Sequence, residues 1–288
     1  MKKLLYTLRS ETLHWVGDGF PVRSMFNYME HAKDFSPFLL MDYAAPSEFS
    51  PTQESRGVGE HPHRGFETVT IIYAGEVAHR DSRGGGGLIK TGDVQWMTAG
   101  AGLVHEEKHG PDFTKKGGIM EMVQLWVNLP KKDKMTQPKY QGILKEQIPT
   151  VPLADEAGSV RVIAGDFLNK KGPASTFSPV NLWDMRTKDE KTVHLEVPDG
   201  QTAALFVLEG ELELEDGKSV NSATIALFER KGGHISFKSK KDSKILFLGG
   251  EPLPDPVVGH GPFVMTTQGD LKQAFLDYQQ GLMGRLAQ

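Results

Sequence analysis

Two pairs of potential metal ligands constrain this chain more than any other feature of its sequence. The segment EHPHRGFETVT contains His61 and His63, and the segment TAGAGLVHEE contains His105 and Glu107. Each pair is separated by one residue, and residues i and i+2 of a β-strand point to the same face. If the two strands lie side by side, three imidazoles and one carboxylate can converge on one divalent metal.

The chain contains no cysteine, so neither a disulfide nor a thiolate nucleophile can form. A metal must therefore be bound by His, Asp and Glu. Nitrogen and oxygen donors of these residues suit iron, zinc, nickel, copper or manganese. The ligand pairs thus predict a metal site without identifying the metal.

Composition favours an all-β fold with two domains. The chain has 288 residues, 32 of them glycine and 17 proline, and its β-branched and aromatic runs are short. Many short strands need many turns, and a chain of this length exceeds the usual size of one core. Strands are expected over 66–78, 88–97 and 122–130, with a loop or hairpin tip at the four glycines 84–87.

We predict an N-terminal metal-binding unit over 1–130, a linker over 131–150, and a second β unit over 151–267. The linker carries KKDK and two prolines but few large apolar residues. Residues 73–77 match residues 208–212, each a strand that runs into a Gly-Glu turn. On that register Glu196 stands opposite His61 and Pro198 opposite His63, so the second unit lacks the metal ligand set.

The chain is expected to end in a helix over 268–288. Leu271, Phe275, Tyr278 and Leu282 recur at the spacing of an amphipathic helix. Asp270 is a plausible N-cap, and Gly281 or Gly284 a plausible end. We expect this helix to pack on the β core.

The net charge of −4 and the pI near 6.2 argue against direct nucleic-acid binding, which usually goes with a basic excess. The N-terminal apolar run ends too soon for a secretory signal, and no stretch is long enough for a membrane span. A cytoplasmic location follows by default.

With these motifs in hand, the chain resembles the pirin family of the cupin superfamily. The resemblance covers nearly the whole chain, and HPHRGFET together with QWMTAGAG carries it most specifically. It implies two jelly-roll (cupin) β-barrels in tandem, a bicupin, with iron, Fe(2+), in the N-terminal barrel only. The family's metal ligands correspond to His61, His63, His105 and Glu107. Glu106 would face the opposite side of the strand, so Glu107 is preferred.

Several neighbouring residues have a functional and a structural interpretation. Glu67 is a candidate fifth ligand or general base, although a hydrogen bond to a ligand histidine is favoured. His79 and Asp81 are expected to have a hydrogen-bonded structural role beside the glycine-rich tip. Three residues of a strand are candidates for lining the pocket, although core packing is favoured: Gln95, Trp96 and Met97. The lysines at 131, 132 and 134, like those between 238 and 244, are expected on the solvated surface.

The resemblance implies two activities of different classes. The first is an iron-dependent dioxygenase that opens flavonols such as quercetin, with an aromatic or enediol substrate and O₂ as reactants and Glu107 as the acceptor of the substrate hydroxyl proton. The second is an iron-dependent or redox-sensing binding protein that regulates a protein partner without turnover. A β protein with an empty site is the third and least favoured interpretation.

Overall fold

The computed structural model describes residues 1–286, and most of its elements are strands. The chain folds into two compact units. The first, called here the histidine unit, comprises 11–33, 38–145 and the described residues from 253 onward. The second, the apolar unit, comprises 1–10, 34–37 and 146–252.

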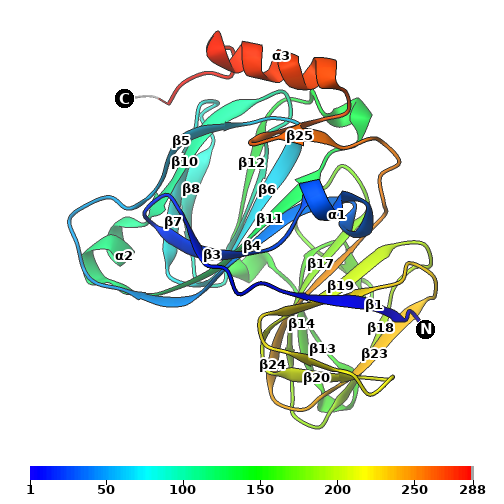
Figure 1. The fold of residues 1–288 in the computed structure, drawn as a ribbon. Coiled ribbons are helices and arrows are strands. Elements are labelled where there is room, and N and C mark those ends of the chain that lie inside the picture. The colour runs from blue at the N-terminus through cyan, green and yellow to red at the C-terminus, as the bar shows by residue number, and fades with distance from the viewer. Residues whose placement is uncertain (287–288) are drawn as a thin grey trace. The chain divides into compact units, whose positions relative to one another are not determined.

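The histidine unit is built from a seven-stranded and a four-stranded antiparallel sheet (Figure 1). In spatial order, the larger sheet contains β12 (Lys139–Ile143), β9 (Val94–Thr98), β6 (Phe66–Ala74), β11 (Gly118–Asn128), β4 (Phe38–Phe49), β3 (Phe20–Asn27) and β2 (His14–Val16). The smaller sheet contains β5 (Gly57–His63), β10 (Leu103–His109), β7 (Glu76–Asp81) and β8 (Gly86–Lys90). A two-stranded ribbon of β25 (Val258–His260) and β26 (Phe263–Met265) completes this unit.

The apolar unit repeats this arrangement with its own seven-stranded and four-stranded sheets. Its larger sheet contains β1 (Leu4–Arg9), β22 (Thr224–Phe228), β19 (Thr202–Glu209), β24 (Ser243–Gly250), β17 (Val180–Thr187), β14 (Gly158–Ala164) and β13 (Thr150–Pro152). Its smaller sheet contains β18 (Thr192–Glu196), β23 (His234–Ser239), β20 (Glu211–Leu214) and β21 (Ser219–Asn221). A short ribbon joins β15 (Asp166–Phe167) to β16 (Lys170–Lys171). Two jelly-roll barrels of cupin type are therefore present, as predicted.

The internal repeat has a structural basis in two matching turns. Gly75 lies between β6 and β7 with φ +96°, and Gly210 lies between β19 and β20 with φ +98°. This left-handed region costs glycine little, whereas a Cβ in it is strained. The matching Gly-Glu pairs thus mark the same strand-to-strand turn in both barrels.

The two units interleave along the sequence, which the expected boundaries at 130, 150 and 267 do not anticipate. β1 pairs with β22 of the apolar unit, and the chain from Leu253 onward belongs to the histidine unit. The expected linker 131–150 instead contributes β12, which pairs with β9. Turns of 3-10 helix flank it at Lys131–Asp133 and Lys145–Gln147, and a third turn follows β13 at Ala154–Glu156.

The prediction that Lys134 lies on the solvated surface is wrong. Its side chain is 2% exposed, and its ammonium group donates to the carbonyls of Gly65 and Val264 and to the side-chain oxygen of Asn128. Burial lowers the pKa of Lys134 to about 7, against an opposing effect of Asp255. These three acceptors compensate the lost hydration and join the C-terminal ribbon to the chain beside the predicted ligands.

The described part of the chain also contains three α-helices: α1 (Tyr28–Phe35), α2 (Pro111–Lys116) and α3 (Gln268–Gln279). The expected C-terminal helix is α3; residues 287 and 288 of its predicted range lie outside the described residues. Thr267 is the N-cap in place of Asp270, because its side chain accepts from the Asp270 amide. The predicted end at Gly281 agrees with its φ of +75°.

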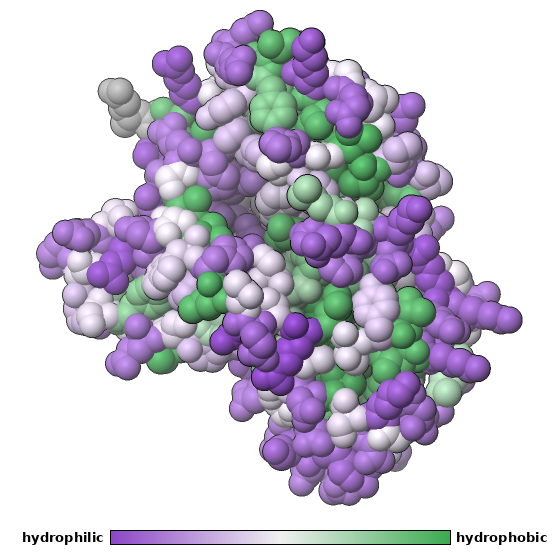
Figure 2. Space-filling view, viewed as in Figure 1, coloured by the Kyte–Doolittle hydropathy of each residue, from purple (hydrophilic) through white to green (hydrophobic). Residues whose placement is uncertain are grey.

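The predicted apolar stripe of α3 is only partly buried. Leu271 and Ala274 are buried, whereas Tyr278 and Leu282 are 40% and 59% exposed. Figure 2 shows hydrophobic side chains among hydrophilic ones over this helix. None of the described helices is both long and apolar enough to cross a membrane.

Candidate metal centre

The two predicted ligand pairs lie on adjacent strands, as the sequence analysis expects. β5 pairs with β10 in antiparallel register, with His61 opposite His105 and His63 opposite Leu103. A bulge follows on β5, so that Glu107 stands opposite Val58. Because paired residues of an antiparallel sheet share a face, this register directs all three imidazoles to the inner face of the smaller sheet.

Three imidazoles converge there. One ring nitrogen each of His61, His63 and His105 lies within 4.8 Å of those of the other two. The ring centroids are 4.2 Å apart for His61 and His105, 4.8 Å for His61 and His63, and 4.9 Å for His63 and His105. Such a group of imidazole nitrogen donors is suited to a first-row divalent metal.

Backbone carbonyls orient two of these rings. The Nδ1 atom of His61 lies 2.8 Å from the carbonyl of Gly59, and Nδ1 of His63 lies 3.4 Å from the carbonyl of Pro262. A carbonyl can only accept, so both Nδ1 atoms carry the proton and both Nε2 atoms keep the lone pair that a metal needs.

His105 supplies the observation that tests the fit to a metal. Its ring is fully buried, and its Nε2 atom has no hydrogen-bond partner. A buried polar atom normally has a hydrogen-bond partner. An imidazole nitrogen without one, beside two other imidazole nitrogens that have free lone pairs, is suited to binding a metal. Burial, with the charges of neighbouring histidines, lowers the pKa of both His63 and His105 well below the ordinary range. Both rings are therefore held neutral, which is the metal-binding form.

Glu107 lies close to His105 but forms a separate group with it. Its carboxylate forms a cluster with His79 and His105 in which the potential ligand atoms lie within 4.8 Å of one another. The first cluster contains only the three histidines. The Gln95 amide donates to Glu107 Oε1 at 3.0 Å, and the Gln124 amide donates to Oε2 at 3.4 Å. The structure thus assembles three predicted ligands directly and holds the fourth at their side, 5% exposed.

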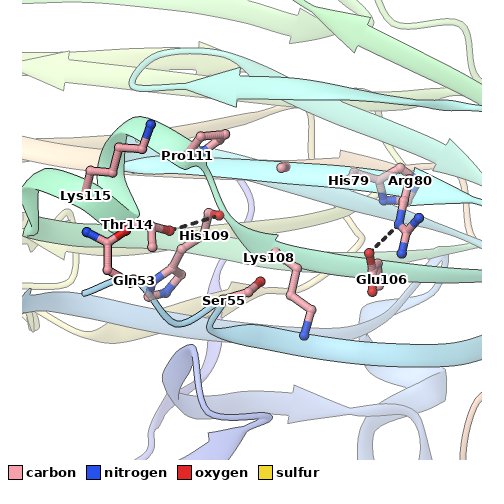
Figure 3. A pocket seen from close by; sticks show the side chains of 11 residues that line it. Gln53, Ser55, His79, Arg80, Glu106, Lys108, His109, Pro111, Thr114 and Lys115 are labelled. Carbon is pink, nitrogen blue, oxygen red and sulfur yellow. Dashed lines mark hydrogen bonds and ion pairs between the residues drawn. The ribbon is translucent and has the colours of Figure 1, made fainter. Parts of the chain in front are cut away.

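Glu106 points the other way, in agreement with the strand alternation. It forms an ion pair with Arg80 on the outer face of β7 and β10. A cavity of about 370 Å³ lies on that face, and Figure 3 shows Arg80, Glu106 and Lys108 in its lining. Ala78, Arg80, Glu106 and Lys108 of its lining share the outer face of β7 and β10, so the sheet separates Glu106 from the imidazole group.

The favoured interpretation of Glu67, a hydrogen bond to a ligand histidine, is wrong. Glu67 is 1% exposed, and its carboxylate accepts from the Thr98 hydroxyl at 2.8 Å. It stands on β6 three residues before Thr70, which contacts Glu107, so alternation turns it to the opposite face of the sheet. Burial raises the pKa of Glu67 to about 7, although hydrogen bonds, with Thr98 first, oppose this.

The three pocket candidates of β9 have different neighbours. Gln95 reaches Glu107 and so belongs to the site, whereas Trp96 points to the opposite face and is fully buried. Met97 packs in a small apolar cluster with Ala99 and Leu103. Core packing is therefore confirmed for Trp96 and Met97, but not for Gln95.

His79 and Asp81 have the expected structural role and one more. Asp81 Oδ1 accepts from the amides of Arg83 and Gly85, which closes the glycine-rich tip. His79 lies between Asp81 and His105, with its Nδ1 atom 3.3 Å from that of His105. The pair is thus part of the surroundings of the metal site.

Three polar residues around the site are not anticipated by the sequence patterns. Thr70 and Gln124 flank Glu107 from β6 and β11, and Tyr140 donates to Gln95 at 3.3 Å. Polar residues at inward positions of otherwise apolar strands were the available signal for the first two. Tyr140 lies in the expected linker, which concealed it.

Comparison with known proteins places these features in a family. The Pirin model matches residues 19–127, and the Pirin C-terminal cupin domain model matches residues 182–284. The chain belongs to the pirin family. The first match contains all four predicted ligands of the metal centre.

Relatives of the family match almost end to end. A Pseudomonas aeruginosa protein with a provisional quercetin 2,3-dioxygenase name is 51% identical over 281 residues, which is 98% of each chain. Human pirin is 35% identical over 257 residues, or 88% of this chain and 84% of that one. A solved structure titled quercetin 2,3-dioxygenase from Acinetobacter baumannii is 51% identical, covers 100% of both chains and has a TM-score of 0.97.

Proposed function

We propose that this pirin family member is a mononuclear non-haem iron protein that opens flavonols such as quercetin with O₂. The observation that carries the proposal is the buried His105 Nε2 atom without a partner, beside two imidazoles whose Nδ1 protons are fixed. Support for the substrate class comes from the quercetin 2,3-dioxygenase names of two 51% identical relatives.

The chain's own residues would divide the work as follows. His61, His63 and His105 hold the metal through Nε2, and Glu107 completes the set. The amides of Gln95 and Gln124 position the Glu107 carboxylate. Bound iron supplies Lewis acidity, which lowers the pKa of a substrate hydroxyl, and a redox couple for reaction with O₂.

Glu107 is the candidate acceptor of the substrate proton. Its carboxylate retains hydrogen bonds from the two glutamine amides, so a proton taken from a flavonol hydroxyl would sit on an already oriented group. Phe66 and Trp126 pack beside His63, with ring centroids 5.1 and 5.2 Å away, and limit the water that reaches the buried side of the site.

The test is anaerobic reconstitution with Fe(2+) and, in parallel, with Zn, Ni, Cu and Mn, because copper, nickel and zinc bind such donors more tightly than iron. Each form is then screened over flavonols and simpler enediols. We expect quercetin consumption with release of carbon monoxide, and loss of both in His61→Ala. The exposed His194 in the apolar unit provides the matched control, His194→Ala.

A fully metal-loaded protein that leaves every flavonol intact would overturn the dioxygenase proposal. It would favour the alternative that the site senses iron or its oxidation state for a regulatory protein partner. Capture of such a partner by the ferrous but not the ferric form would then identify that role. A cytoplasmic location stays a prediction from the sequence.

A further inference from the structure

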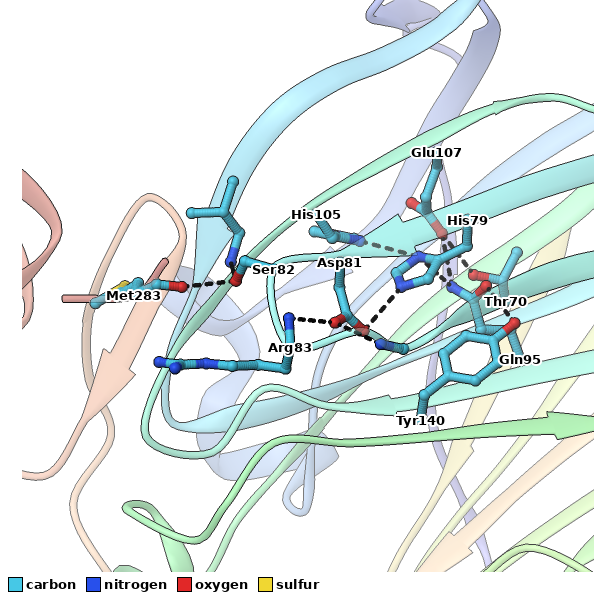
Figure 4. A network of polar contacts seen from close by, with 12 residues as sticks. Thr70, His79, Asp81, Ser82, Arg83, Gln95, His105, Glu107, Tyr140 and Met283 are labelled. Carbon is cyan, nitrogen blue, oxygen red and sulfur yellow. Dashed lines mark hydrogen bonds and ion pairs between the residues drawn. The ribbon is translucent and has the colours of Figure 1, made fainter. Parts of the chain in front are cut away.

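A continuous set of polar contacts lies behind His105 and leads away from the predicted metal position (Figure 4). It starts at His105 Nδ1, which is 3.3 Å from His79 Nδ1. His79 Nε2 lies 3.5 Å from Asp81 Oδ2, and all three side chains are buried. Unlike His61 and His63, His105 has an imidazole rather than a backbone carbonyl at its Nδ1 atom.

Two contacting ring nitrogens require that one carries a proton and the other does not. The neighbouring Gln95 decides which. Its Oε1 atom accepts from the Tyr140 hydroxyl at 3.3 Å, which leaves its Nε2 group to donate. That amide reaches Glu107 Oε1 at 3.0 Å and His79 Nδ1 at 3.3 Å. An amide NH₂ group can only donate, so His79 Nδ1 is an acceptor whose one lone pair faces both the Gln95 amide and His105 Nδ1.

The positions of the remaining protons can be deduced from this acceptor. If His79 Nδ1 accepts, the proton of the neutral ring is on Nε2, which faces Asp81 Oδ2. His105 Nδ1 then donates to His79, and the lone pair of His105 is left on Nε2. That atom is buried and has no hydrogen-bond partner; His79 Nε2 has none either and lies 3.5 Å from Asp81 Oδ2.

Asp81 is itself fixed as an ionised acceptor. Its Oδ1 atom accepts from the amides of Arg83 at 2.8 Å and Gly85 at 3.0 Å. Burial alone would raise the pKa of Asp81, but hydrogen bonds from His79 and these amides outweigh it and lower the pKa. The carboxylate thus ends the set of contacts with a negative charge at the point where a donor arrives.

We propose that Asp81 and His79 are positioning residues of the metal centre, which impose the Nδ1-protonated tautomer on His105 and direct its Nε2 atom at the metal. The inference rests on the metal site of the proposed function. A carboxylate–imidazole pair behind a ligand histidine fixes the ring and makes it a stronger donor. Tyr140 adds to the restraint, since its ring stacks on His79 at 5.0 Å.

The competing interpretation is that His79 is itself a ligand, because it groups with His105 and Glu107 within 4.8 Å. Its Nδ1 atom, however, contacts His105 and Gln95, and its Nε2 atom, although without a hydrogen bond, lies 3.5 Å from the Asp81 carboxylate. Ligation through either nitrogen would break these contacts, so the geometry favours positioning over coordination.

The test is a substitution that moves the proton of His79 to its other ring nitrogen and keeps the shape of the substituted side chain. Asp81→Asn can keep the oxygen that accepts from Arg83 and Gly85 but presents an amide to His79 Nε2, which forces His79 into the other tautomer. Two donors would then meet between His79 and His105. Glu106→Gln makes the same chemical change on the outer face of β10 and is the matched control.

Nitrogen-15 NMR of the metal-free protein reads the tautomers without any metal. In the wild type we expect His105 to be protonated on Nδ1 and His79 on Nε2; Asp81→Asn should shift the signals of both rings, and Glu106→Gln neither. His105 protonated on Nε2 in the wild type would overturn the inference. This readout is independent of the proposed function, which fails instead if wild-type protein of the expected tautomer binds no metal.

Titration with Fe(2+) or Mn(2+) alone gives the second readout. Loss of such an outer partner is expected to weaken metal binding about 10- to 100-fold in Asp81→Asn and in His79→Phe, which keeps the aromatic ring. Unchanged affinity in Asp81→Asn would overturn the inference, even if His79→Phe fails to fold. In the Cu(2+)-loaded protein, EPR should count the same imidazoles in wild type and Asp81→Asn; loss of one in His79→Phe would make His79 a ligand.

Discussion

The two four-stranded sheets of the molecule share an architecture and differ in the chemistry of their inner faces. In the histidine unit, the inner face of β5, β10 and β7 carries three imidazoles, a carboxylate and the pair behind them. In the apolar unit, the inward residues of β18, β23 and β20 belong to one hydrophobic core: Val193, Leu195, Leu212, Leu214, Ile235 and Phe237. The histidines at 194 and 234 point outward and are exposed.

The difference shows what each inner face costs and contributes. Apolar side chains gain free energy simply by leaving water, at about 25 cal/mol per Å² of buried area. Buried polar groups cost free energy unless each finds a partner. In the histidine unit Gln95 and Gln124 satisfy Glu107, and Asp81 and His79 satisfy one side of His105. The free nitrogen of His105 is the place where a metal would supply the missing partner.

The largest effect is expected from removing a ligand. His63→Ala should lower metal affinity by more than about 100-fold, because a direct ligand matters more than an outer partner. His194→Ala, on the corresponding sheet of the apolar unit, should leave affinity unchanged. Metal content after purification without chelators, followed by titration, measures both. Equal metal content in the two variants would contradict the assignment of metal binding to the histidine unit.

A substitution in the four-stranded sheet of the apolar unit should change the stability of the protein and not its metal affinity. Phe237 is 1% exposed, and Phe237→Ala is expected to cost about 3–5 kcal/mol through lost burial and a cavity. Metal stoichiometry should not change. Urea denaturation of the metal-free protein measures the loss, with the exposed Lys241→Ala as control. If Phe237→Ala also abolished metal binding, the two sheets would not have separate roles.

Sequence patterns were sufficient for the parts of this comparison that depend on periodicity. The i,i+2 spacing predicts a common face for His61 and His63 and for His105 and Glu107, and the β5–β10 register brings the three histidines together. The family resemblance agrees with the family models. Alternation also separates Glu106 from Glu107.

What could not be predicted depends on contacts between distant segments. The carbonyl that orients His63 belongs to Pro262, about 200 positions later, and Lys134 is buried only because Val264 and Gly65 lie beside it. Tyr140 enters the site through the pairing of β12 with β9. Nothing local in the sequence encodes these pairings, because chain topology creates them.

A smaller effect, on the pH dependence of stability, should distinguish the seven-stranded sheets of the two units. Glu67 is buried on β6, whereas Thr202 stands at the matching position of β19 on the repeat register. Since the folded pKa of Glu67 is raised to about 7, its favourable contribution is complete below about pH 4.5 and is lost as pH rises through 7. Glu67→Gln should therefore match wild type at low pH and be more stable by about 3–4 kcal/mol at pH 9, at about 1.4 kcal/mol per pKa unit.

Denaturant unfolding across this pH range measures the difference. A constant difference at all pH values would mean that Glu67 is not held protonated by burial. The free-energy cost of burying polar groups in this sheet would then arise at other residues.

The smallest effect concerns the C-terminal segment, which only the histidine unit possesses. Arg64 follows the predicted ligand His63, and its guanidinium donates to Asp277 of α3 at 2.7 Å. Asp277 also accepts from Gln273 on the same helix. The two side chains are 5% and 15% exposed, so this pair is shielded from water more than a surface ion pair. Asp277→Asn keeps the shape and an accepting oxygen, and should lower stability by about 1–2 kcal/mol, and less at high salt.

Metal affinity provides the sharper measure in this variant. The backbone of Arg64 is held separately, because its amide donates to the Pro262 carbonyl and its carbonyl accepts from the Val264 amide. His63 should thus keep its orientation when the ion pair is lost, and affinity should fall less than about tenfold, below the range for partners that touch a ligand. A fall as large as that of Asp81→Asn would instead mean that α3, rather than the ribbon alone, positions His63.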